Sequence, residues 1–142
     1  MADAFDLQRF KKAQERDYAT ALGELRAGRK RSHWIWYVFP QLEELGYSPT
    51  AKFYGISGAA EAKAYLADAL LGARLLECAQ ALLALESSNP SAVMGYPDDL
   101  KLCSSMTLFE AVGEGDTRWM PFGQVIDKFY GGQRDARTLE LL

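Results

Sequence analysis

Leu70 to Glu86 reads LLGARLLECAQALLALE, and this stretch decides the fold. Leu71, Leu75, Cys78 and Leu82 follow one another at steps of four and three, which is the repeat of an α-helix. Further leucines and alanines widen the apolar stripe around them. The stretch therefore predicts a helix at the centre of a hydrophobic core.

Helices are predicted on both sides of this stretch. Apolar residues at helical spacing indicate an amphipathic helix from about Leu7 to about Ala27, with Asp6 as its N-cap and Gly28 just beyond its end. Two cap-proline pairs, Ser48-Pro49 and Asn89-Pro90, each open a short helix. The predicted shorter helices cover about 49–54, 58–68, 90–95, 99–112, 121–130 and the residues after Asp135.

The aromatic segment from Ser32 to Pro40 is rich in residues that favour strands, but the chain offers no second strand for it to pair with. We therefore interpret it as a buried irregular or short helical segment that ends before the proline. This interpretation predicts that Trp34, Trp36 and Phe39 are largely buried.

Counting these elements gives seven or eight unequal helices and no sheet. The fold class is therefore all-α, and residues 1–142 form one domain with no internal repeat. With 49% hydrophobic residues, a chain of this length buries roughly 68–70% of its unfolded surface, so it needs no disulfide or metal to fold.

Charge and cysteine content indicate which partners and which cellular compartment the sequence favours. The net charge is −3, and the basic residues near Arg29 lie at a helix end that favours cations, so nucleic acid is not a favoured partner. Cys78 and Cys103 both lie in apolar helical patterns, which is typical of reduced thiols in the cytoplasm. The first residues carry no secretory pattern and the longest apolar run, residues 35–39, is too short for a bilayer. We expect a cytoplasmic protein without a membrane segment.

His33 is the only histidine, so any nucleophile that depends on an imidazole base must depend on this residue. The simpler interpretation is that Ser32 and His33 brace the aromatic segment through hydrogen bonds. One histidine and two distant cysteines give no zinc spacing, and no phosphate-binding glycine loop occurs. The sequence therefore predicts neither a metal nor a cofactor.

A second group of polar residues lies in the helix predicted from about residue 99. Asp98 and Asp99 stand where carboxylates complement the positive end of a helix, so we interpret them mainly as capping residues. Lys101 precedes Ser105 by one turn, which places a cation and a hydroxyl on one helical face. Such a pair is able to hold an anionic group.

Two motifs carry a resemblance to a known family. Ser32-His33-Trp34-x-Trp36 is followed by Phe39-Pro40-Gln41, and Lys101-Leu102-x-Ser104-Ser105-Met106-Thr107-Leu108-Phe109 lies downstream. The sequence resembles the bacterial family catalogued as domain of unknown function 1810 over nearly its whole length. The resemblance implies a mostly helical superhelix suggested to mediate protein contacts, and no established activity. Members often carry the name calpastatin, a disordered inhibitor, which the apolar composition argues against.

Two hypotheses of function remain. The first is a protein–protein interaction module in which Trp34, Trp36 and Tyr37 contact another polypeptide. The alternative is a pocket, formed where the two motifs converge, for a small anionic or nucleotide-like molecule, with or without hydrolysis. Its predicted lining residues are Lys30, Ser32, His33, Gln41, Lys101, Ser105 and Thr107.

Overall fold

The structure is a computed structural model that describes residues 5–142, and within this range it contains nine α-helices and two short 3-10 helices. No strand forms among these residues, and the β-bridge between Leu42 and Ile56 is isolated. The all-α prediction is confirmed. The helices are α1 (Gln8–Ala27), α2 (Ile35–Val38), η1 (Glu43–Leu45), α3 (Pro49–Phe53), α4 (Ala59–Ala67), α5 (Ala69–Leu83), α6 (Pro90–Met94), α7 (Asp98–Val112), η2 (Thr117–Trp119), α8 (Met120–Tyr130) and α9 (Ala136–Leu141).

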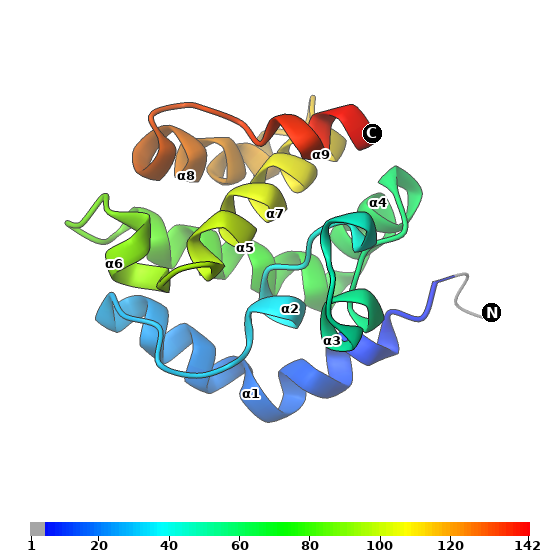
Figure 1. Ribbon diagram of the computed structural model, residues 1–142, viewed down its shortest axis with the longest axis horizontal. Coiled ribbons are helices and arrows are strands. Elements are labelled where there is room, and N and C mark those ends of the chain that lie inside the picture. The colour runs from blue at the N-terminus through cyan, green and yellow to red at the C-terminus, as the bar shows by residue number, and fades with distance from the viewer. Residues whose placement is uncertain (1–4) are drawn as a thin grey trace.

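Helix α5 lies at the centre of the molecule, as its apolar stripe predicts. Figure 1 shows α5 between α1 on one side and α8 on the other, with α7 crossing it. Leu71, Leu75, Cys78 and Leu82 are almost completely buried. Burying one such leucine contributes about 1.5–3 kcal/mol. The core therefore joins elements from both ends of the chain around α5. In the described part of the chain, every helix is too short or too polar to cross a membrane.

The two ends of α1 differ in how well the sequence predicts them. Gly28 follows the helix with φ of 81°, and its amide closes the last turn on Leu25, as a residue after a helix end is expected to do. At the other end, Leu7 and not Asp6 occupies the N-cap position, and it makes no side-chain cap bond. The predicted cap at Asp6 is wrong, because α1 begins at Gln8, one residue later than expected, and the N-cap position moves to Leu7.

The carboxyl end of α5 is closed by a lysine from α8. The ammonium group of Lys128 donates to the carbonyl oxygens of Leu82 (3.3 Å), Leu83 (3.0 Å) and Leu85. The last carbonyls of a helix have no partner within the helix, and a cation there also interacts well with the helix dipole. Lys128 therefore ties α8 to the central helix.

We expect Lys128→Met to lower the free energy of unfolding by about 1–3 kcal/mol, because carbonyls at the end of α5 lose a charged donor. Lys63→Met is the matched control, since Lys63 is an exposed lysine on α4. Urea unfolding measures both variants. Equal midpoints would contradict the capping role of Lys128.

The aromatic segment forms a single helical turn, α2, between two irregular stretches. Trp34 and Phe39 are each 1% exposed, which confirms their predicted burial. Trp36 is partly buried against the core, less completely than the other two. A one-turn helix turns successive side chains to different sides, and Trp36 lies toward the surface side of α2.

Candidate functional site

The two sequence motifs meet at the amino end of α7, where two lysines share one carboxylate. The ammonium group of Lys30 lies 2.8 Å from one oxygen of Asp98, and that of Lys101 lies 3.3 Å from the other. Lys30 also donates to the backbone oxygen of Ser32 and lies 4.9 Å from the ring centroid of Trp34. We call Lys30, Asp98 and Lys101 the lysine–aspartate cluster.

The two lysines of the cluster differ in their access to solvent. The side chain of Lys30 is 6% exposed, whereas that of Lys101 is about a quarter exposed. The cluster holds two cations and one carboxylate, which leaves a surplus of one positive charge. Arg29 and Arg31, both exposed, lie beside Lys30 in the sequence. Asp99 adds a second carboxylate to the first turn of α7 and Glu24 adds a third beside Ser32, so the four cations exceed these carboxylates by one.

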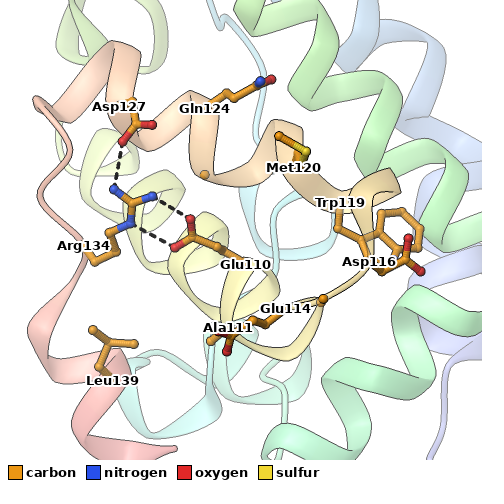
Figure 2. A pocket seen from close by; sticks show the side chains of 13 residues that line it. Glu110, Ala111, Glu114, Asp116, Trp119, Met120, Gln124, Asp127, Arg134 and Leu139 are labelled. Atoms are coloured by element: carbon orange, nitrogen blue, oxygen red, sulfur yellow. Dashed lines mark hydrogen bonds and ion pairs between the residues drawn. The ribbon is translucent and has the colours of Figure 1, made fainter.

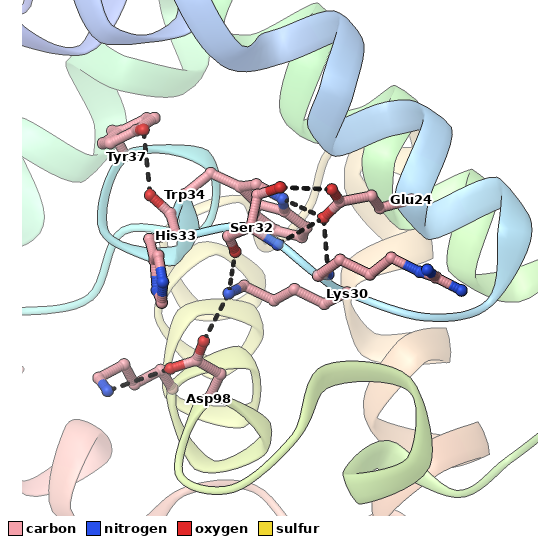
Figure 3. Close-up of polar contacts among 9 residues, drawn as sticks. Glu24, Lys30, Ser32, His33, Trp34, Tyr37 and Asp98 are labelled. Carbon is pink, nitrogen blue, oxygen red and sulfur yellow. Dashed lines mark hydrogen bonds and ion pairs between the residues drawn. The ribbon is translucent and has the colours of Figure 1, made fainter.

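The loop that carries Ser32 and His33 is held in place by Glu24 of α1 (Figure 3). The Glu24 carboxylate accepts hydrogen bonds from the amides of Arg31 (2.8 Å) and Ser32 (3.0 Å). It also accepts from the Ser32 hydroxyl (2.6 Å) and from the Trp34 indole (2.8 Å). Burial alone would raise the pKa of Glu24, but these hydrogen bonds together lower it from 4.5 to about 2. Glu24 is therefore a charged anchor for the loop.

His33 is exposed, and its backbone oxygen accepts a hydrogen bond from the Tyr37 hydroxyl at 3.2 Å. Figure 3 shows its imidazole extending toward the end of α7 that carries Asp98, on the same side as the Lys30 ammonium group. The loop therefore presents an imidazole beside the lysine–aspartate cluster. Pro97 is the N-cap residue, and Asp98 and Asp99 both lie in the first turn of α7, where carboxylates complement the helix end as expected. Asp98 in addition forms ion pairs with the two lysines.

Comparisons with known proteins show which family this chain belongs to. The family model for a protein of unknown function, DUF1810, matches residues 4–142. The chain belongs to the DUF1810 family. It is also similar to the crystal structure of the conserved hypothetical protein Rv1873 from Mycobacterium tuberculosis, with 51% identity and a TM-score of 0.94. That match covers 99% of this chain and 98% of the other. Among curated proteins, none matches.

In this member of the DUF1810 family, three of the predicted pocket residues do not join the cluster. Ser105 and Thr107 are fully buried in the middle of α7. The Thr107 hydroxyl accepts from the amide of Asp135 at 3.0 Å, so it braces the start of α9. The Ser105 hydroxyl has no hydrogen-bond partner among residues 5–142. Gln41 lies beside the β-bridge, where its backbone oxygen accepts from the amide of Ile56.

The three predicted interface residues differ in their exposure to solvent. Trp34 is 1% exposed and Tyr37 is 4% exposed, so both are core residues and cannot anchor a partner through their side chains. The Trp34 indole donates a hydrogen bond to Glu24, and the Tyr37 hydroxyl donates one to Asp17. These hydrogen bonds hold both rings in the core. Only Trp36 of the three offers side-chain surface. Among residues 5–142, no group of three or more possible ligands is placed to hold a metal ion.

Proposed function

We propose that the protein binds a small anionic molecule, of the size of a nucleotide phosphate, at the surface formed by Lys30, His33 and Lys101. The observation that carries the proposal is the sharing of the Asp98 carboxylate by two lysine ammonium groups. An anion that approaches from solvent meets Lys101 and His33 first, because both are accessible while Lys30 lies behind them. Asp98 keeps both lysines in place without cancelling their combined charge.

The alternative, an interaction module built on the aromatic segment, has less support. Two of its three proposed anchors are buried, and hot-spot residues of an interface must be accessible in the free protein. The anion-binding hypothesis instead uses residues that the fold brings together from segments far apart in the sequence.

Thermal unfolding with inorganic pyrophosphate and with ADP tests this function. We expect at least one of these probes to raise the Tm of the parent protein, because a ligand present at a hundredfold excess over its Kd stabilises the native state by about 2.7 kcal/mol. Lys101→Met and His33→Ala should remain folded and lose most of that rise. Lys52→Met is the matched control, since this exposed lysine lies on α3 and outside the cluster, and it should keep the rise.

Sodium chloride at the same ionic strength separates specific binding from charge screening. The function is contradicted if neither probe raises the Tm beyond the salt control. It is equally contradicted if Lys101→Met and Lys52→Met respond alike.

A further inference from the structure

A hollow of about 630 Å³ lies at the other end of α7, away from the lysine–aspartate cluster. Its apolar lining comes from Trp119, Met120 and Leu139, which belong to η2, α8 and α9. Met120 is 57% exposed and Leu139 is 49% exposed. Figure 2 shows these two side chains on either side of the Glu110–Arg134 pair. The hollow therefore has large apolar side chains that no element of the described chain covers.

Ion pairs and a stacked aromatic pair surround this hollow. Arg134 donates to both carboxylate oxygens of Glu110, at 2.9 and 2.5 Å, and to Asp127 at 2.8 Å. A Cβ at Gly123 would collide with the Glu110 carboxylate, so the glycine lets this pair lie close against α8. Trp119 stacks on Phe122 with the ring planes 7° apart. These contacts fix the polar and the apolar parts of the hollow relative to each other.

The net charge around the hollow is negative. Glu110, Glu114, Asp116 and Asp127 line it, and Arg134 is the single cation among the lining residues. Arg118 pairs with Asp116 at 2.7 Å, so two negative charges remain in excess. The guanidinium of Arg134 is already occupied by two of these carboxylates, so it is not free to receive an anion. Glu114 is exposed at the edge of the hollow. A ligand that complements this surface carries positive charge and apolar side chains together.

We propose that this hollow is a docking site for a basic amphipathic segment of another protein. The apolar face of such a segment covers Met120 and Leu139, and its lysine or arginine side chains approach Glu114, the lining carboxylate that pairs with neither Arg134 nor Arg118 in the described chain. A methionine at the mouth suits this role, because its flexible side chain adapts to different apolar surfaces. The proposal is independent of the anion site, since it uses different residues and the opposite charge.

The test uses a fluorescent helical peptide of about 18 residues, which is roughly five helical turns, built from leucine and lysine. Binding to the full chain is followed by fluorescence anisotropy. We expect the double variant Met120→Ser/Leu139→Ser to weaken binding by about tenfold or more, because both side chains lose apolar contact. Glu114→Lys is expected to weaken binding severalfold through repulsion.

The matched controls are substitutions of an exposed apolar residue and an exposed acid outside the hollow. Tyr47→Ser removes an exposed apolar side chain near η1, and Glu44→Lys reverses an exposed acid in η1, so both should bind the peptide as the parent does. A peptide in which glutamate replaces lysine should bind at least tenfold more weakly. Equal binding of the two peptides, or equal losses in the control variants, would overturn the proposal. Self-association that disappears in the double variant would also overturn it, by identifying a second copy of the chain as the occupant.

Discussion

Trp34→Ala is expected to lower the free energy of unfolding by about 3–5 kcal/mol, the range for removing a large aromatic side chain from a packed core. Trp34 is 1% exposed, its ring lies 6.2 Å from that of Phe39, and its indole donates to Glu24 at 2.8 Å. The substitution therefore leaves a cavity and also removes one donor from the Glu24 carboxylate. Urea unfolding followed by circular dichroism gives the change.

Trp36→Ala is the matched control for this prediction. Trp36 lies two residues further on but is only partly buried, so its loss should cost about half as much or less. The contrast between the two tryptophans would be refuted by equal shifts of the urea midpoint. It would also be refuted if Trp36→Ala proved the more damaging change.

Glu24→Gln is expected to cost about 2–3 kcal/mol at pH 7, since hydrogen bonds to a charged acceptor are worth more than those to an amide. The amide of glutamine also places an N–H group where Glu24 receives four donors. Glu15→Gln, an exposed position on the same helix, is the control and should change stability by less than about 0.5 kcal/mol.

The effect of Glu24→Gln on stability should also depend on pH. The folded-state pKa of Glu24 lies near 2, below its ordinary value of 4.5, so its contribution to stability is complete above pH 4.5 and is lost as the pH falls toward 2. The stability difference between the parent and Glu24→Gln should therefore shrink between pH 5 and pH 2. A difference that stays constant over this range would show that the carboxylate charge is not what holds the loop.

Local sequence signals predict the helices of this protein well, because the spacing of apolar residues and the capping residues act over a few positions. The stripe of α5 and the cap at Asp135, which accepts from the Thr138 amide at 3.0 Å, are examples. The helix starts at Ser48 and Asn89 are further examples, since both side chains accept amide hydrogen bonds.

The candidate site was only partly predictable, because its key contacts join distant segments. Lys30 and His33 could be named from their motif, but the pairing of Lys30 with Asp98 spans 68 positions and depends on the packing of α7. Glu24 was missed because it lies on the polar face of α1, where its pattern does not differ from that of Glu15. Ser105 and Thr107 were proposed as ligand residues because polar groups inside an apolar run demand partners. For Thr107 that partner is the backbone of Asp135.

Helix α7 connects the two surfaces on which this protein is proposed to act. Asp98 and Lys101 lie in its first turn, Glu110 lies in its last turn, and the residues from Ser104 to Phe109 between them are buried. Its 15 residues span about 22 Å at 1.5 Å per residue. A ligand that moves this helix at one end moves a wall of the other site. Thermodynamic linkage then requires that each ligand change the affinity of the other by the same factor.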